Sequence, residues 1–254
     1  MRAQVVLVSG ALAILVGVAC STTTGGTKAS EAAGTDSTAG DDDTTGTGST
    51  KKTDSGTTTV VSGGDVNPYG VAYPTENIGR QVRKGTTPGN VMENFKFYGY
   101  IDGDPSAERK RVSLADYYDP EMKKYKVVHI QSSGVWCKPC NDETKEVGKI
   151  ADQLPGLKVA YIIALTQGPK PGEPSTDADL VTWLKNLDPK VTNVLDPGDE
   201  ALGVFYDPAG IPWNANLDAR TMEVLSSGTG APSKGPLADV TKWVEWVDAN
   251  PASY

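Results

Sequence analysis

The sequence YKVVHIQSSGVWCKPC, residues 125–140, decides the fold. Its first part, Tyr125–Gln131, is rich in branched apolar residues and predicts a strand. From Cys140 to Leu154, apolar residues recur at helical spacing, which predicts a helix. The motif Trp136-Cys137-Lys138-Pro139-Cys140 therefore lies where a strand gives way to a helix. In open α/β sheets, reactive groups collect at this end of the strands.

The two cysteines of this motif are spaced for redox chemistry. A helix N-terminus offers free N–H groups and a partial positive charge, which favour a thiolate over a thiol. We expect Cys137 at the helix start with its sulfur exposed, and Cys140 one turn later, more buried and close enough to bridge. Pro139 lacks an N–H that would have no partner in a first turn, and the cation of Lys138 should further lower the pKa of Cys137.

Other interpretations of the pair stay open. It could be an inert structural disulfide, although a loop this short removes little entropy from the unfolded chain. It could also be a zinc half-site, or a copper site that includes His129, the single histidine of the sequence. The chain has only 3 cysteines, which excludes a disulfide scaffold and a four-cysteine zinc site.

Strands and helices alternate on both sides of the motif. A hairpin is predicted from residues 94–100 and 111–114. Further strands are predicted at 157–165, 191–195, 213–217 and 221–226, and further helices at 177–187, 200–205 and 237–247. This order predicts an α/β fold with a central mixed sheet, helices on both of its faces, and an antiparallel last pair of strands.

Composition excludes several classes of partner and cofactor. The net charge of -8 argues against nucleic acid or an anionic membrane surface as a direct partner, because both select basic patches. Glycines form no strand–loop–helix pattern for binding a nucleotide or a flavin. We therefore expect no cofactor other than the cysteine pair, and no metal site.

The N-terminal part of the chain predicts export. Residues 1–19 combine an early positive charge with a short apolar run, too short to span a bilayer, and read as a signal peptide. The run ends in Val18-Ala19-Cys20, which resembles a bacterial lipobox, so we expect a lipid on Cys20. The alternative is an ordinary cleaved signal with an incidental cysteine.

A tether is predicted to follow over residues 20–64. From Ser21 to Gly64, 29 of the 44 residues are Ser, Thr or Gly. The segment has too few apolar residues for burial to offset the loss of chain entropy on folding. Such a segment would typically reach about 35–40 Å. Residues 65–254 remain as one domain, with its core at about 86–254.

With these pieces in place, the chain resembles the thioredoxin superfamily, in particular the exported TlpA-like redoxins. The resemblance covers roughly residues 86–254 and implies a thioredoxin-like fold with an N-terminal β-hairpin extension. The matching pieces are Asn94-Phe95 with Ser113-Leu114-Ala115-Asp116, Trp136 to Cys140, Gly210-Ile211-Pro212 and the closing helix. It implies that Pro212 is a cis-proline against the active-site disulfide and that Ile211 offers its backbone to a substrate strand. A trans loop proline is the alternative.

The chain departs from the family pattern at several positions. Thioredoxins keep a buried Asp six residues before the first cysteine, where this chain has Gln131, which cannot accept a proton. His129 points to the same face of the strand, and we expect it to be a packing residue. Trp213 replaces the common Thr after the cis-proline and is expected to reshape the substrate groove. The loop motif that a peroxiredoxin needs before its cysteine is missing.

The resemblance implies an extracytoplasmic thiol-disulfide oxidoreductase, and the N-terminal segment with Cys20 implies that it is tethered by a lipid to a bacterial membrane. Cys137 would attack a protein disulfide and Cys140 would resolve the mixed disulfide, supported by Trp136, Lys138 and Pro139. Its partners would be protein thiol or disulfide substrates and an unidentified redox partner. The alternatives are a non-enzymatic redoxin-fold binding lipoprotein and a metallochaperone that uses the cysteine pair.

Overall fold

The structure is a computed structural model, which describes residues 63–74 and 88–251. The predicted signal peptide, Cys20 and the tether up to residue 62 lie outside the described residues. Within the two described ranges, no helix combines the length and the hydropathy that a bilayer span requires.

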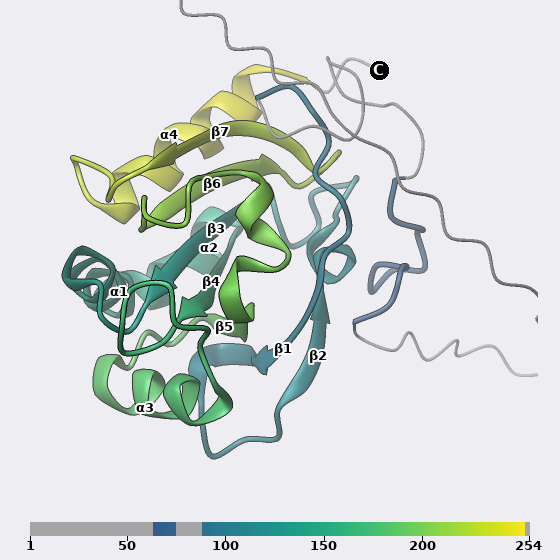
Figure 1. The fold of residues 1–254 in the computed structure, drawn as a ribbon. Helices are drawn as coiled ribbons and strands as arrows, with labels where there is room; N and C mark the ends of the chain where they lie inside the picture. The colour runs from purple at the N-terminus through teal and green to yellow at the C-terminus, as the bar shows by residue number, and fades with distance from the viewer. Residues whose placement is uncertain (1–62, 75–87, 252–254) are drawn as a thin grey trace, which may run out of the picture. The chain divides into compact units, whose positions relative to one another are not determined.

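In the described part of the chain, a seven-stranded mixed sheet forms the centre of the fold (Figure 1). The strands are β1 (Lys96–Tyr100), β2 (Lys110–Ser113), β3 (Val127–Gly134), β4 (Val159–Gln167), β5 (Thr192–Leu195), β6 (Trp213–Asp218) and β7 (Glu223–Thr229), in the order β2-β1-β5-β4-β3-β6-β7. β3, β4 and β5 are parallel, whereas β1 pairs antiparallel with β5 and β6 pairs antiparallel with β3. β1–β2 and β6–β7 are antiparallel pairs. The predicted mixed sheet with an N-terminal hairpin is confirmed.

The helices are α1 (Lys138–Ile150), α2 (Leu154–Leu157), α3 (Asp177–Leu187) and α4 (Pro236–Ala249). α1 begins two residues earlier than predicted, because Cys137 caps its N-terminus. The short helix predicted at 200–205 is present only as a three-residue 3-10 helix, Leu202–Val204. The carboxylate of Asp196 accepts hydrogen bonds from the backbone N–H groups of Ala201 and Leu202, which anchors a tight turn instead of a continuous helix.

The expectation of helices on both faces of the sheet is wrong. Buried side chains of α1, α3 and α4 belong to one apolar cluster, which includes Val147, Leu184 and Val244. The reason is topological. β3 connects through α1 to β4, and β4 connects through α3 to β5, so both crossovers advance in the same direction across the sheet. Because such crossovers are right-handed, both helices fall on the same face.

Turns and the N-terminal segment cover the other face. Tyr73 and Met92 belong to its apolar cluster, and the Tyr73 hydroxyl donates to the Met92 carbonyl at 2.8 Å. The backbone N–H of Gly63 donates to the carboxylate of Asp116, and the carbonyl of Gly64 accepts from an asparagine side chain. The last two residues of the predicted tether are therefore bonded to the folded domain.

Candidate active site

Cys137 and Cys140 form a disulfide at the junction of β3 and α1, with 5.3 Å between their Cα atoms. Cys137 is the N-cap residue of α1, and Pro139 lies in the first turn. The backbone N–H of Cys140 donates to the sulfur of Cys137 at 3.2 Å. In the reduced protein, the same N–H group and the helix dipole stabilise a thiolate on Cys137.

The expectation of an exposed Cys137 sulfur is wrong. Cys137 is 1% exposed and Cys140 is 0% exposed. The sulfur of Cys137 lies 3.7 Å from the carbonyl oxygen of Ile211, which packs in the same apolar cluster. The segment before Pro212 thus covers the disulfide, which sequence spacing alone does not indicate.

The structure brings Ile211 and Pro212 to the cysteine pair but places Trp213 elsewhere. The Ile211–Pro212 peptide bond is cis, as the resemblance implies. Trp213 is 1% exposed and packs in the apolar cluster on the other face of the sheet, against the rings of Phe205 and Tyr206. Because β-strand side chains alternate between faces, an indole at the first position of β6 enters the core and does not line a substrate groove.

The side chain of Lys138 is 82% exposed and pairs with Asp142, one turn along α1. This pairing lowers the pKa of Asp142, mainly through the hydrogen bond from Lys138. The charge of Lys138 is therefore shared with a carboxylate, and the group that contacts the Cys137 sulfur is the N–H of Cys140.

A chain of hydrogen bonds that sequence reasoning missed fixes Trp136. Its indole Nε1 donates to Oε1 of Gln167 at 2.9 Å. The Gln167 amide donates to the carbonyl of Pro208 at 2.8 Å and to Asp199 at 3.2 Å. The hydroxyl of Tyr206 donates to the same Asp199 carboxylate at 2.6 Å. These contacts link the residue before Cys137 to the loop that leads to the cis-proline.

A buried carboxyl group lies near the cysteine pair. It comes from α1, whereas the family pattern places an acidic residue on β3, at the position of Gln131. Glu143 follows Cys140 by three residues, and it is 4% exposed. Desolvation raises the pKa of Glu143 to about 7, against a hydrogen bond from Asn214 that lowers it. Its Oε2 accepts from the Asn214 amide nitrogen at 3.4 Å, and a hydrogen bond with Tyr161 has a smaller lowering effect on its pKa. The signal for this residue was its helical spacing from Cys140 and Val147, which places it on the apolar face of α1.

Gln131, at the position where the family pattern has an acid, is part of a neutral network. Its amide nitrogen donates to the hydroxyl oxygens of Ser133 and Thr144 at 2.8 and 3.0 Å. Its carbonyl oxygen accepts from the hydroxyl of Tyr161 at 3.1 Å. Every polar atom of the Gln131 side chain is thereby occupied, and its role is structural.

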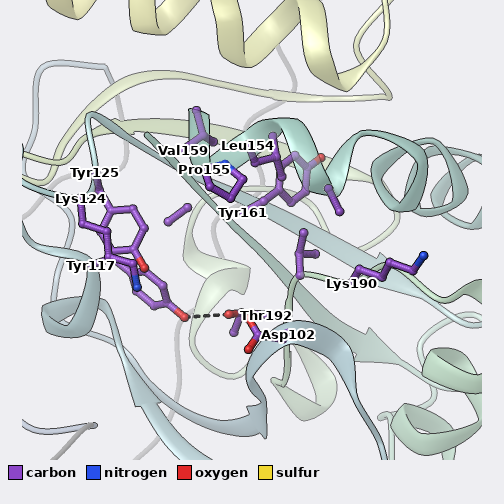
Figure 2. Close-up of a pocket in the computed structure, with 13 residues that line it drawn as sticks. Asp102, Tyr117, Lys124, Tyr125, Leu154, Pro155, Val159, Tyr161, Lys190 and Thr192 are labelled. Carbon is purple, nitrogen blue, oxygen red and sulfur yellow. Dashed lines mark hydrogen bonds between the residues drawn. The ribbon is translucent and has the colours of Figure 1, made fainter. Parts of the chain in front are cut away.

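Two of the hollows in the described part of the chain lie near opposite ends of β4. A groove of about 880 Å³ runs beside the motif and is lined by residues that include Lys138, Pro139 and Glu143. A cavity of about 310 Å³ lies at the start of β4 and β5. Figure 2 shows the second one, in which the Tyr117 hydroxyl donates to Thr192 at 2.9 Å. Because Cys137 follows the C-terminal end of β3, which is parallel to β4, this cavity is remote from the disulfide.

No protein-family model and no curated protein matches the sequence. The chain has partial similarity to solved structures. They include the thioredoxin domain of a thiol-disulfide oxidoreductase from Bacteroides vulgatus, 16% identical with a TM-score of 0.46, covering 64% of this chain and 98% of that chain. The exposed lipoprotein thioredoxin Etrx1 from Streptococcus pneumoniae is 21% identical, with a TM-score of 0.42. The match covers 59% of this chain and 98% of that chain. The reduced 2-Cys peroxiredoxin from Plasmodium vivax is 13% identical, with a TM-score of 0.48. The match covers 65% of this chain and 98% of that chain.

The chain's own topology identifies the fold. β3, α1 and the parallel strand β4 form a βαβ unit with a Cys-x-x-Cys disulfide at the start of its helix. A cis-proline precedes the antiparallel pair β6–β7, and α4 closes the chain. This arrangement is a thioredoxin-like fold.

Proposed function

We propose that the protein is a thiol-disulfide oxidoreductase that acts on protein disulfides. The observation that carries the proposal is the N–H of Cys140 directed at the sulfur of Cys137, at the N-terminus of α1 and within a two-cysteine disulfide. Because an N–H donor and the helix dipole act at its sulfur, the thiolate form is more stable on Cys137 than on Cys140. Cys137 is the nucleophile and Cys140 the resolving thiol.

The reaction transfers two electrons in two steps. The Cys137 thiolate attacks one sulfur of the client disulfide, a mixed disulfide forms, and the first client thiolate leaves. The deprotonated Cys140 then attacks the Cys137 sulfur, the second client thiolate leaves, and the Cys137–Cys140 disulfide remains. The client has gained two electrons, and each of its thiolates takes up a proton. A redox partner must restore the dithiol, and the reverse sequence oxidises a client dithiol.

Glu143 is the group best placed to accept the proton of Cys140. It lies one helical turn after Cys140 on the buried face of α1. A carboxyl whose pKa is raised to about 7 exchanges protons readily near neutral pH. Glu143 also lines the groove beside the motif, through which its proton can pass to solvent.

The backbone at Ile211 offers a docking position for the client. Its carbonyl oxygen lies 3.7 Å from the Cys137 sulfur, so a client strand that pairs with this segment brings its own sulfur toward Cys137. The same segment covers the disulfide, which means that docking must displace part of it. The hydrogen bonds from Trp136 through Gln167 to Pro208 hold the rest of the loop in place.

The test compares Cys137→Ser with Cys140→Ser in the full chain, with Cys20→Ser as the control for loss of a thiol outside the motif. With Cys140→Ser, mixed disulfides between Cys137 and client proteins should accumulate, because the resolving step is blocked. With Cys137→Ser, reduction of a model disulfide should fall to the uncatalysed rate, whereas Cys20→Ser should keep the parent's rate. The proposal is abandoned if Cys137→Ser is as active as the parent.

The Cys140→Ser variant and a metal analysis of the reduced protein separate the alternatives. A non-enzymatic binding lipoprotein would form no mixed disulfide in the Cys140→Ser variant. A metallochaperone would retain copper or zinc on the reduced pair after purification, which metal analysis detects. Among the described residues, no group of three or more His, Cys, Asp and Glu side chains is arranged to hold a metal ion.

We also propose an extracytoplasmic location with a lipid on Cys20. The proposal rests on the apolar run of residues 5–18, on the sequence Val18-Ala19-Cys20, and on the Ser-, Thr- and Gly-rich residues that follow. Two thiols remain in the chain when Cys20 carries a lipid, and they are the pair of the motif.

A further inference from the structure

The cavity of about 310 Å³ at the start of β4 and β5 has no part in the proposed redox reaction. It lies at the opposite end of the parallel strands from the disulfide. Hollows of about 300–1,000 Å³ that combine apolar walls with a few converging polar groups are typical binding sites for small molecules. This cavity is at the lower end of that range, so its ligand is a small one.

The walls of the cavity are largely apolar. Figure 2 shows Leu154, Pro155 and Val159 along one wall. The rings of Tyr117 and Tyr125 stand on another side, 5.6 Å apart between their centroids. These aliphatic and aromatic surfaces can enclose an apolar group of a ligand and remove it from water.

Two contacts hold the rim of the cavity in place without a ligand. The Tyr117 hydroxyl donates to Thr192 at 2.9 Å, which ties the segment before β3 to the first residue of β5. The 3-10 turn Ile101–Gly103 packs on the chain that enters β5, because a Cβ atom on Gly103 would lie 3.0 Å from the carbonyl oxygen of Val191. The cavity is therefore preformed, as small-molecule sites usually are.

A cation and an anion line the cavity. The Nζ atom of Lys124 lies 4.9 Å from the centroid of the Tyr125 ring, and a hydrogen bond with the Tyr125 side chain raises the pKa of Lys124. Asp102 lies beside Thr192 in Figure 2, away from Lys124. Among the described residues, neither Lys124 nor Asp102 forms an ion pair. The charge of Asp102 contributes to the raised pKa of Lys124, so the two groups are close enough to act on one ligand.

The backbone at Asp102 marks this residue among the charges of the rim. Its φ angle is 64°, in the left-handed region, and the next residue, Gly103, has a φ angle of 68°. Glycine adopts this conformation without steric cost, whereas a residue with a Cβ atom is less favourable there. Residues held in such conformations cluster at binding and catalytic sites. A carboxylate is thus kept at the cavity at a cost to stability.

We propose that this cavity binds an amino acid with an apolar side chain. Its α-carboxylate faces Lys124, its α-ammonium group faces Asp102, and its side chain packs against Leu154 and Pro155. A zwitterion matches a cavity that offers one cation and one anion. A simple carboxylate leaves Asp102 without a partner, and a simple amine leaves Lys124 without one. The proposal is independent of the oxidoreductase function.

The first test measures binding to the full chain by titration calorimetry, with L-leucine and L-phenylalanine as probes. The matched analogues are isocaproate and hydrocinnamate, which lack the amino group, and isopentylamine and phenethylamine, which lack the carboxylate. We expect saturable binding of an amino acid and at least about tenfold weaker binding of both of its analogues. No saturable binding of either amino acid up to about 10 mM, or equal binding of an analogue, overturns the proposal.

The second test locates the site through the backbone of Asp102. Asp102→Gly removes the carboxylate and suits the left-handed conformation, so the variant should be at least as stable as the parent in urea. It should bind the amino acid at least about tenfold more weakly. The control is Asp188→Gly, which changes another aspartate with a positive φ angle, 44°, outside the cavity. That variant should keep the parent's affinity.

The third test removes the cation. Lys124→Met keeps most of the length of the side chain and should also weaken binding at least about tenfold, whereas Lys123→Met, the neighbour that pairs with Glu121, should not. Unchanged affinity in either folded Asp102→Gly or folded Lys124→Met protein overturns the assignment of the ligand to this cavity. The cysteine variants decide the oxidoreductase function separately, since neither cysteine lines the cavity.

Discussion

Glu143 is a carboxyl group inside an apolar core, and its burial makes the stability of the protein depend on pH. Its pKa is raised from 4.5 to about 7. Between these two values the folded protein binds more protons at this site than the unfolded chain does, so stability falls as pH rises. The stabilising contribution of protonated Glu143 to the free energy of unfolding is fully present below the pKa of the unfolded chain. It is lost as the pH rises through the pKa of Glu143 in the folded protein. It amounts to about 3 kcal/mol at most.

We predict that Glu143→Gln removes this pH dependence. Glutamine has nearly the same shape but carries no charge to desolvate, so the variant should be about 2–3 kcal/mol more stable than the parent above pH 7. Below about pH 4.5 the advantage should vanish. Denaturant unfolding at a series of pH values measures this. The matched control is Glu146→Gln on the same helix, whose side chain is 55% exposed. Parallel stability curves for the parent and Glu143→Gln would contradict the prediction.

The sequence identifies the reactive residues better than the residues that surround them and exchange protons with them. Cys137, Cys140 and Pro212 belong to motifs with fixed spacing, and the structure brings all three to one place. Glu143 belongs to no motif, because its role depends on which face of α1 is buried. Trp213 was misplaced for the related reason that its face of β6 depends on strand register.

At the scale of elements, the turn from β3 into α1 is tightly packed at Gly134. A Cβ atom there would lie 2.9 Å from Cδ1 of Ile211 and 3.1 Å from the indole nitrogen of Trp136. Both neighbours belong to the site, since Ile211 covers the disulfide and Trp136 is held by Gln167. Glycine is required here for close approach of side chains and not for an unusual backbone angle.

We predict that Gly134→Ala destabilises the protein by about 1–3 kcal/mol, because the added methyl group must push Ile211 or Trp136 aside. The control is Gly156→Ala in α2, where a Cβ atom would meet nothing within 4 Å. That change should leave stability equal or raise it by up to about 1 kcal/mol, since alanine favours helix more than glycine does. Urea unfolding of both variants measures the difference. Equal midpoints for the two variants would rule out tight packing at Gly134.

Element types were predictable from the sequence, but their placement on the sheet was not. Alternating runs predicted β3, α1, β4 and α3 at nearly the right residues. Hydrophobic periodicity does not reveal strand order, and strand order decides which face of the sheet each helix covers. The expectation of helices on both faces therefore rested on the alternation of elements alone. The order places β4 and β5 successively on one side of β3, and this sends α1 and α3 to one face.

At the scale of the whole molecule, average composition conceals differences between segments. The apolar fraction of 38% combines an apolar N-terminal run, a long Ser-, Thr- and Gly-rich segment, and a domain whose sheet is buried on both faces. The cysteines divide in the same way, with Cys20 at the start of the Ser-, Thr- and Gly-rich segment and the other two in the folded domain. Each segment therefore needs its own test.

We predict that Cys20→Ser releases the protein from the membrane. On the proposed lipoprotein signal, the apolar run ahead of Cys20 would be removed, and a lipid on the new N-terminal cysteine would then be the attachment. In a bacterial host fed a tagged fatty acid, the full chain should be labelled and should sediment with membranes. Cys20→Ser should be unlabelled and soluble, whereas Cys137→Ser, which also lacks one thiol, should behave as the parent does. An unlabelled, soluble parent would instead support an ordinary cleaved signal, and label on Cys20→Ser would place the lipid on another residue.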